Sequence, residues 1–401
     1  MRVGILAPVA PEGIGGGYTL EREIFEQVLE CAETSDHEFV VFEGLKGSRA
    51  ENKRPNVQYV SLKGALAARA YSALRNIAKR RTYWWEKRWI GDILKRERIE
   101  FFLGTSFEAL TLDIPFLVIV WDLQHRLQPF FPEVSSGHIW QRRENFFSQV
   151  LRRAAYVIAG TQAGKEEIQM FYGVPSERIR ILPHPTPRFA LEERRSAPVE
   201  LAKYKLPRDY VFYPAQFWSH KNHAGILRAI LRLKEADNLV LPVVFTGSDQ
   251  GNESHVRQLV QSLRLEEQVY FLGHVSREVL RALYQDAFVL CYLSFFGPEN
   301  MPPLEAFALG CPVVAADVPG ASEQLGDAAW RVNPASESEI AQALKSLFYD
   351  KAKRESLILR GKERARRFTG KDFAKGLLGL LDEFEPIRRC WPSDPGASSI
   401  S

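Results

Sequence analysis

Two apolar segments, with a loop and a proline-rich helix start between them, constrain the fold of this chain more than any other stretch. The run Phe288–Leu293 has the length of a strand. Residues 297–300 interrupt it, because glycine and proline break regular structure. Pro302 and Pro303 suit the first turn of a helix, where a missing N–H costs nothing. The apolar residues 312–316 indicate a parallel strand covered on both faces, so the stretch predicts a strand–helix–strand unit.

The predicted helix would begin at the carboxyl edge of a parallel sheet. Free N–H groups and the helix dipole at such a start favour an anion by about 0.3–1 kcal/mol, and by up to about 2 kcal/mol when partly buried. We expect this start at Met301–Leu304, and Glu305 in the same turn can accept hydrogen bonds from ribose hydroxyls. Donors for phosphate beside an acceptor for hydroxyls suit a nucleotide sugar.

The sequence PPLEAFALGCPVVAADVPGASEQLGDAA resembles the donor-site signature of family-four retaining glycosyltransferases with the GT-B fold, the glycosyl transferases group 1. That family shows two glutamates eight positions apart, the second of them in P-x-L-E-A. Glu305 matches the second, whereas Gly297 stands at the position of the first. The resemblance implies that Glu305 binds the donor nucleotide. We expect Glu299 to replace the missing glutamate, with Asn300 and Met301 also binding the donor.

A second donor element follows the predicted strand Tyr210–Tyr213. In the resembled family the loop after this strand supplies an arginine and, five residues on, a lysine for the donor diphosphate. Lys221 matches the lysine, and Gln216 stands where the arginine would be. The next predicted strand, Val243–Thr246, leads to Gly247, which the resemblance places beside the nucleotide.

The first half of the chain offers weaker signals. A glycine-rich turn follows the strand Val3–Pro8, and the resemblance places its Gly16 and Gly17 near the donor phosphate and the acceptor. Asp122 and His125 come just past a predicted strand end, where open α/β sheets carry ligand groups. We expect these two residues to be catalytic on the acceptor side. The alternative is that Asp122 caps a turn and His125 is merely exposed.

Length and composition limit the remaining function classes. A chain of 401 residues suits two domains, and a net charge of +4 is too small to indicate nucleic-acid binding by itself. No apolar run reaches the roughly 18 residues of a membrane-spanning helix. The four cysteines are scattered, with no paired motif, so we expect no metal site, no disulfide framework and a reducing, cytoplasmic location.

Residues 63–98 differ in character from the rest of the chain. They hold eleven lysines and arginines, with Trp84, Trp85 and Trp89 interleaved. Such a pattern fits a surface that lies on an anionic membrane, and the protein would then be peripheral on the inner face with a lipid-linked acceptor. The alternative is a solvated pair of helices whose tryptophans pack inward. No nucleic-acid recognition motif accompanies the charge.

The fold that we predict is α/β, with two doubly wound, Rossmann-like parallel-sheet domains facing a cleft, as in GT-B proteins. Residues 1–187 would form an acceptor-side domain, completed by a C-terminal helix at 371–386. Residues 188–205 would link it to a nucleotide-sugar-binding domain at 206–370. We expect residues 387–401 to be a tail.

The resemblance implies a retaining, metal-independent hexosyltransferase without a cofactor. Its donor would be a nucleotide-diphosphate sugar, and its acceptor the hydroxyl of a glycan or lipid-linked molecule in surface polysaccharide or glycolipid synthesis. Two alternatives stay open. One is a sugar-nucleotide epimerase of the same fold. The other is a non-catalytic nucleotide-sugar-binding protein, which Gly297 and Gln216 would suit.

Overall fold

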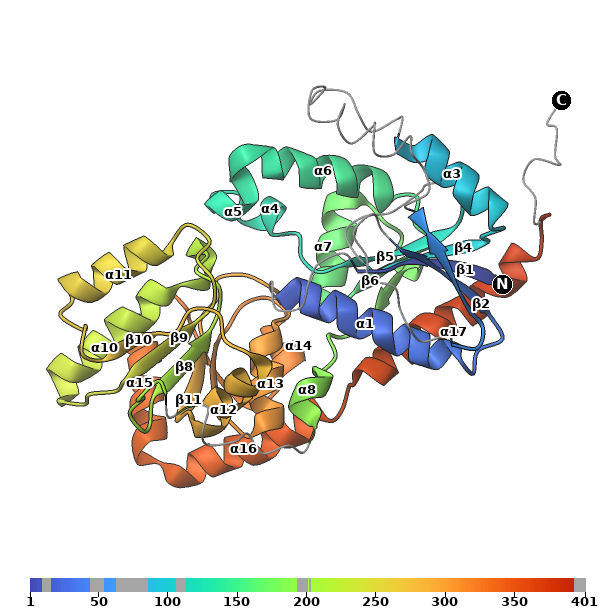
Figure 1. Ribbon diagram of the computed structural model, residues 1–401. Coiled ribbons are helices and arrows are strands. Elements are labelled where there is room, and N and C mark those ends of the chain that lie inside the picture. Colours follow the sequence, from blue (N-terminus) through green and yellow to red (C-terminus); the bar gives the residue numbers. More distant parts are fainter. Residues whose placement is uncertain are drawn as a thin grey trace.

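Two parallel β-sheets, each with helices on its faces, form the body of the protein (Figure 1). The computed structural model describes residues 1–8, 16–43, 54–62, 86–105, 113–192, 201 and 203–392. The strand order is β3-β2-β1-β4-β5-β6-β7 in the first sheet and β10-β9-β8-β11-β12-β13 in the second. In each sheet the order of the strands reverses beside the strand that comes first in the chain, which is β1 in the first sheet and β8 in the second, as in doubly wound folds. The predicted fold class is therefore confirmed.

The first sheet is built from short apolar strands that are buried at its centre. Its strands are β1 Arg2–Leu6, β2 Glu38–Glu43, β3 Val57–Ser61, β4 Phe101–Gly104, β5 Phe116–Val120, β6 Tyr156–Ala159 and β7 Ile179–Ile181. The helices are α1 Gly16–Ala32, α3 Glu86–Arg96, α4 Gln124–Leu127, α5 Pro132–Ser135, α6 Ile139–Val150 and α7 Gln162–Tyr172. Every residue of β4, β5 and β6 is buried, as expected for parallel strands covered on both faces.

The second sheet repeats this architecture around a larger core. Its strands are β8 Val211–Pro214, β9 Val243–Thr246, β10 Val269–Phe271, β11 Val289–Tyr292, β12 Val313–Ala316 and β13 Ala329–Val332. The helices are α10 His223–Asp237, α11 Glu253–Ser262, α12 Arg277–Asp286, α13 Met301–Leu309, α14 Ala321–Leu325, α15 Glu337–Tyr349 and α16 Lys351–Ala365. Gly310, at φ 78°, ends α13 in the left-handed conformation that favours glycine. The strand–helix–strand unit predicted from the apolar pattern is thus present.

Two segments connect the domains. The helix α8 (Arg188–Leu191) leads into the second domain, and α17 (Gly370–Arg388) returns to the first, where Figure 1 shows it beside α1. Apolar residues of α17, including Phe373 and Leu377, share one core with α1. The connections meet where Thr186 N–H donates to Phe368 O at 3.1 Å. The chain therefore crosses twice between the domains at one place.

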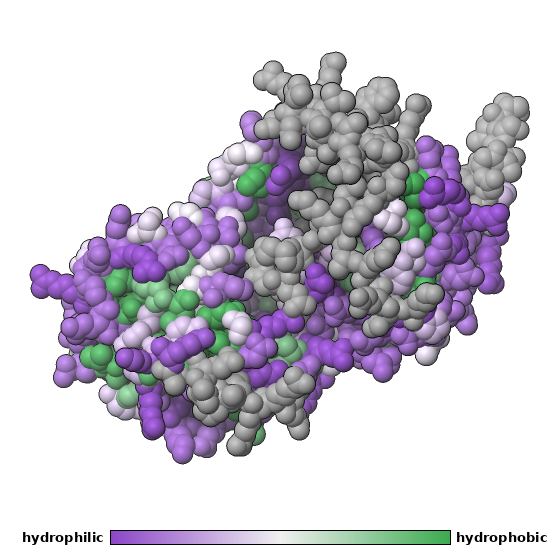
Figure 2. All heavy atoms as spheres, viewed as in Figure 1, coloured by the Kyte–Doolittle hydropathy of each residue, from purple (hydrophilic) through white to green (hydrophobic). Residues whose placement is uncertain are grey.

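Two observations concern a possible contact with a membrane, namely the polarity of one face and the length and polarity of the described helices. The face in Figure 2 is mostly hydrophilic, with hydrophobic residues in smaller patches on both domains. Within the described ranges, no helix is both long and apolar enough to cross a membrane. The basic, tryptophan-containing region at 63–98 lies outside the described residues up to residue 85, and only the end of α3 shows its side chains.

Candidate functional site

Polar contacts join the two domains where strands of both sheets end. In the first domain the segment after β5 contains α4 and α5, and it contacts two loops of the second domain. Glu133 Oε1 accepts a hydrogen bond from His220 N–H at 2.8 Å. Gln128 Nε2 donates to Phe295 O at 3.0 Å. The carboxyl ends of parallel strands are the usual position of ligands in such folds, so this junction is the candidate site.

Lys221 lies at the centre of this junction. It ends the turn Ser219–Lys221 after β8, and its ammonium donates to Tyr292 Oη at 2.7 Å and to Ser294 Oγ at 3.4 Å. Burial lowers the pKa of Lys221 to about 8, although the nearby carboxylates of Asp122 and Glu133 oppose the shift. Lys221 is therefore mainly an ammonium group at neutral pH, facing two acidic residues of the other domain.

Gln216 and Gly247 lie in adjoining loops beside this lysine turn. Gln216 Nε2 donates to Ser248 Oγ at 2.9 Å, and its Oε1 accepts from Trp218 Nε1 at 3.1 Å. Gly247 has φ 135°, and a Cβ there would overlap the carbonyl of Ala215. Only glycine fits this close approach of two backbones. The role of Gln216 and Gly247 in donor binding stays a prediction.

The start of α13 offers fewer donors than its dipole alone suggests. A helix start has four N–H groups without a helical partner. Here Pro302 and Pro303 supply none, and the N–H of Asn300 donates to Gln324 Oε1 at 2.9 Å. This leaves the N–H of Met301, whose side chain packs into the core of the first domain. The expectation of several free donors was wrong, because proline has no N–H.

Glu305 is a buried residue of α13. Its Oε2 accepts a hydrogen bond from Tyr284 Oη at 2.6 Å. Burial raises the pKa of Glu305 to about 7, against the opposing effect of the Tyr284 hydrogen bond. A carboxyl group with this pKa can accept hydrogen bonds from hydroxyl groups when ionised. Its predicted contact with a ribose stays a prediction.

Glu299 crosses to the first domain in this structure. Its Oε1 accepts a hydrogen bond from His184 N–H at 2.7 Å, and its Oε2 lies 3.6 Å from His184 Nε2. The carboxyl group also lies against Gly160, where an added Cβ would overlap Oε2. Burial raises the pKa of Glu299 to about 8. In this conformation Glu299 contacts the first domain through His184. The predicted role of Glu299 in binding the donor sugar stays a prediction.

Asp122 faces Lys221 from the first domain. Its Oδ1 accepts hydrogen bonds from Gln124 N–H at 3.0 Å and from the Arg143 guanidinium. Burial alone would raise the pKa of Asp122, but Arg143 and the Gln124 N–H together lower it below its ordinary value. Asp122 is therefore a carboxylate at neutral pH. It caps the following turn, as one of the two sequence readings proposed, and it also faces the candidate site.

His125 is enclosed rather than exposed. Its side chain is fully buried, with Nδ1 accepting from Arg143 Nε at 3.2 Å and Nε2 within 3.1 Å of Tyr172 Oη. Burial and then the Arg143 charge lower the pKa of His125 to about 4. The alternative of an exposed histidine was wrong. The predicted acceptor-side role is untested, and the structure links His125 to the site through Arg143 and Asp122.

The glycine turn is only partly described. Gly16 begins α1, whereas Gly13 and Gly15 lie outside the described residues. Gly17 is exposed, and a Cβ there would meet no atom within 4 Å. Packing within the chain therefore does not require glycine at position 17. The predicted approach of Gly16 and Gly17 to a phosphate or acceptor stays a prediction.

The sequence did not identify three residues that form contacts at the junction, namely Glu133, His220 and Glu323. Glu133 and His220 contact each other although 87 positions separate them. Glu323 accepts hydrogen bonds from the N–H groups of Gln162 and Ala163, and so caps α7 from the other domain. The only signals were that Glu133 follows a strand end and that His220 precedes Lys221. Neither signal identifies a partner.

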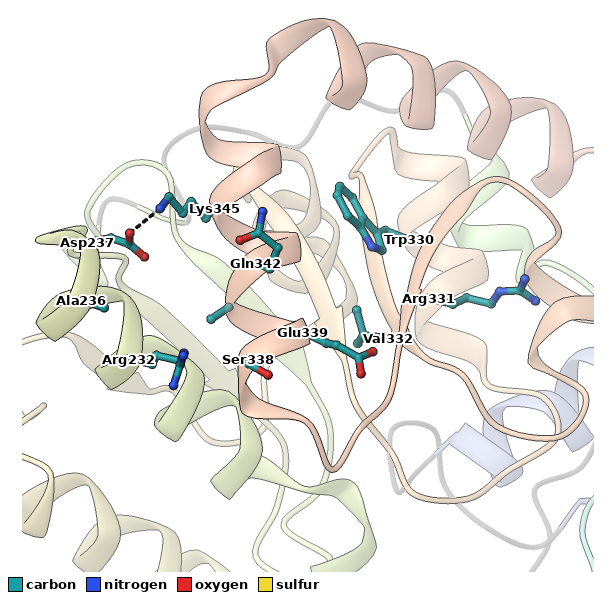
Figure 3. Close-up of a pocket in the computed structure, with 11 residues that line it drawn as sticks. Arg232, Ala236, Asp237, Trp330, Arg331, Val332, Ser338, Glu339, Gln342 and Lys345 are labelled. Carbon is teal, nitrogen blue, oxygen red and sulfur yellow. Dashed lines mark hydrogen bonds and ion pairs between the residues drawn. The ribbon is translucent and has the colours of Figure 1, made fainter.

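A separate cavity lies between α10, β13 and α15 (Figure 3). It measures about 580 Å³, and Trp330, Arg331 and Arg232 are among its lining residues. Lys345 and Asp237 form an ion pair at its side. None of the predicted site residues lines this cavity. Among the residues that the structure describes, no three His, Cys, Asp or Glu side chains are grouped so as to hold a metal ion.

Comparisons with known proteins agree on family and fold. The family model described as Glycosyl transferases group 1 matches residues 200–364. An O-antigen chain mannosyltransferase of Salmonella typhimurium is 26% identical over 224 residues, which are 56% of this chain and 59% of that protein. O-antigen chain mannosyltransferase B of Escherichia coli is 27% identical over 229 residues, covering 56% of this chain and 60% of that one. This chain thus spans about 60% of the length of these curated relatives.

Solved structures match over nearly the whole chain. A sucrose-phosphate synthase from Thermosynechococcus elongatus superposes with a TM-score of 0.71 at 17% identity, covering 96% of this chain and 99% of that one. The Anabaena protein HepE, solved with UDP and glucose, gives a TM-score of 0.68 at 16% identity, covering 96% and 100%. These likenesses show the GT-B fold. The resemblance stated from the donor-site residues is confirmed.

Proposed function

We propose that this chain, which belongs through residues 200–364 to the glycosyl transferases group 1, transfers a sugar from a nucleotide-diphosphate sugar to an acceptor hydroxyl. One observation carries the proposal. The lysine that matches the family's diphosphate-binding position, Lys221, lies at the junction of the two domains and faces carboxylates of the opposite domain. A donor bound there would have its leaving group at the cation and its sugar toward the acceptor-side domain.

The leaving diphosphate needs positive charge as its bond to the sugar breaks. Stabilising charge that develops in the transition state is usually the largest single catalytic contribution. Lys221 would supply the charge, with help from the Met301 N–H and the dipole of α13. Because proline occupies two helix positions and Gln216 replaces an arginine, Lys221 would be the main contact of the diphosphate. In this proposal Lys221 supplies the positive charge, and no metal ion or cofactor takes part.

The acceptor would approach from the first domain. Asp122, held as a carboxylate by Arg143, can accept a hydrogen bond from the acceptor hydroxyl. In our proposal the hydroxyl attacks the sugar from the face that the diphosphate leaves. The configuration is then retained, the departing diphosphate takes the hydroxyl proton, and no residue forms a covalent intermediate. Glu305 would bind the ribose.

The relatives suggest the class of substrates. Two of them are named O-antigen chain mannosyltransferases, so we extend the proposal to a hexosyl donor and to a glycan or lipid-linked acceptor in surface polysaccharide synthesis. We place this activity in the cytoplasm, at the inner face of the membrane. Binding of residues 63–98 to anionic lipid would bring the enzyme to a lipid-linked acceptor.

A two-step experiment tests the proposal. A thermal-shift screen of nucleoside diphosphates and their sugars identifies the donor, since a ligand that binds the native state raises its stability. The chosen donor is then incubated with glycan and polyprenyl-linked acceptors, and the product is analysed for the new bond and its anomeric configuration. Formation of a glycoside that depends on both substrates supports the proposal. Conversion of the donor alone into an epimer would favour a sugar-nucleotide epimerase. Binding of the donor without any release of nucleoside diphosphate would favour a non-catalytic binding protein.

A further inference from the structure

The residue before Lys221 is held from three sides, and one of the three is the opposite domain. Glu133 Oε1 accepts the backbone N–H of His220 at 2.8 Å, and it also contacts His220 Nδ1. The carbonyl of His220 accepts Phe295 N–H at 2.8 Å. The imidazole stacks on Phe296, with ring centroids 3.7 Å apart. The backbone that carries Lys221 is thus fixed by its own domain and by Glu133 together.

The protonation states suit these contacts. Burial and then the Lys221 charge lower the pKa of His220 to about 4, so the imidazole is neutral at pH 7 and Nδ1–H donates to Glu133. Burial alone would raise the pKa of Glu133, but its hydrogen bonds from His220 lower it below the ordinary value. Glu133 is therefore a carboxylate that accepts two N–H groups of one residue. Hydrogen bonds to an ionised acceptor are about twice as strong as neutral ones.

The charge of Glu133 also acts on the lysine. The titratable groups that face Lys221 come from each element around it: Asp122 after β5, Glu133 on α5, His220 on the lysine turn, His223 at the start of α10 and Tyr292 on β11. Of these, Asp122 and Glu133 are anions at neutral pH. Both favour the ammonium form of a lysine that burial would otherwise discharge.

We propose that Glu133 is a positioning residue for the donor diphosphate: it holds the His220–Lys221 turn from the acceptor-side domain and adds a carboxylate beside the lysine. This inference rests on the proposed function, because it assigns Lys221 to the diphosphate. The contact joins the two domains, so the position of the lysine turn depends on both of them.

The test compares Glu133→Gln with Glu133→Asp and with Ser135→Ala. Glutamine keeps the shape of the side chain and removes its charge, whereas aspartate keeps the charge on a shorter side chain. Ser135 is exposed on the same short helix and its hydroxyl donates to Phe131 O, so its variant controls for disturbance of α5. Unfolding temperatures and circular dichroism of all variants show whether the fold is intact.

Two readouts are measured from about pH 6 to pH 9.5, a range that brackets the titration of a buried lysine. The first is the rate of acetylation of Lys221 by trace acetic anhydride, read by mass spectrometry on the protein without ligand. The second is the affinity for UDP, GDP, ADP and dTDP. Removing the carboxylate lowers the pKa of Lys221, so in Glu133→Gln the amine should react at lower pH than in the wild type. Nucleoside diphosphate binding should weaken by about tenfold near pH 8 and by less near pH 6.

The outcomes separate the two proposals. The inference holds if Glu133→Gln shifts both profiles to lower pH, while Glu133→Asp shifts them less and Ser135→Ala follows the wild type. It is overturned if Lys221 of Glu133→Gln acetylates with the wild-type pH profile. A wild-type protein that binds no nucleoside diphosphate at any pH would instead contradict the proposed function, whereas the acetylation profile would still report whether Glu133 controls the lysine.

Discussion

Replacing Glu299 with glutamine should stabilise the protein at neutral and alkaline pH. The Glu299 side chain is 2% exposed, it accepts the His184 N–H at 2.7 Å and it lies against Gly160 of the other domain. Glutamine has the same shape and keeps a carbonyl oxygen for the His184 N–H. The substitution therefore removes the ability to ionise and changes little else.

The sign and size follow from proton linkage. Burial raises the pKa of Glu299 from 4.5 to about 8, so the folded state holds a proton that the unfolded chain releases above pH 4.5. Stability due to this group is therefore full below pH 4.5 and is lost as pH rises toward 8. The loss is about 1.4 kcal/mol per pH unit in that window, or about 3 kcal/mol at pH 7. The glutamine variant avoids this loss.

Thermal unfolding from pH 4 to pH 9 measures the effect, with Glu177→Gln as the matched control, because Glu177 is exposed. The difference in unfolding temperature between Glu299→Gln and the wild type should be near zero at pH 4, grow with pH and level off above about pH 8. The control should show no such trend. A wild-type advantage that grows with pH would refute the reasoning, because Glu299 would then be a stabilising carboxylate.

Three further substitutions address the same junction. Gly160→Ala places a Cβ on Glu299 Oε2 and should lower the free energy of unfolding in urea by about 1–3 kcal/mol. The double variant Gly160→Ala with Glu299→Ala should recover most of that loss. As a control, Gly379→Ala should be neutral or stabilising, because its Cβ meets no atom within 4 Å. Glu323→Ala removes the acceptor of two N–H groups at the start of α7, where Thr161 remains the N-cap, and should cost up to about 1 kcal/mol. Amide exchange at Gln162 and Ala163 should become faster, and unchanged exchange there would contradict this role of Glu323. Glu305→Gln keeps the shape of the side chain and removes its negative charge, so it should weaken the binding of nucleoside diphosphate. Titration calorimetry measures the affinity, and equal binding would remove Glu305 from the donor site.

Local chemistry made much of the fold predictable. The apolar run at 312–316 and the proline pair of α13 specify a buried strand and a helix start on their own, and Gly310 ends the helix where only a left-handed residue fits. Lys221 and Glu305 were found because a family pattern fixes their positions in the sequence. The donor shortage at α13 could have been read from the same prolines, because each lacks an N–H.

Contacts between distant segments were not predictable in this way. Glu133 and His220 meet only because α5 and the lysine turn face each other across the two sheets, and a pattern within either segment carries no information about the other. His125 shows the same limit. Its position after β5 was correctly predicted, but its burial depends on packing against Phe147 and Tyr172, which come from later helices.

The affinity of Lys221→Ala for the nucleoside diphosphate of the donor, measured by titration calorimetry, tests the central claim most directly. Losing a charge-assisted contact of this kind costs about 1.5–3 kcal/mol, so binding should weaken by at least about tenfold while the unfolding temperature stays near that of the wild type. Lys353→Ala, which removes a cation over the Trp330 ring away from the junction, should bind as the wild type does. Equal affinity in folded Lys221→Ala and wild-type protein would contradict the claim that this lysine holds the donor diphosphate.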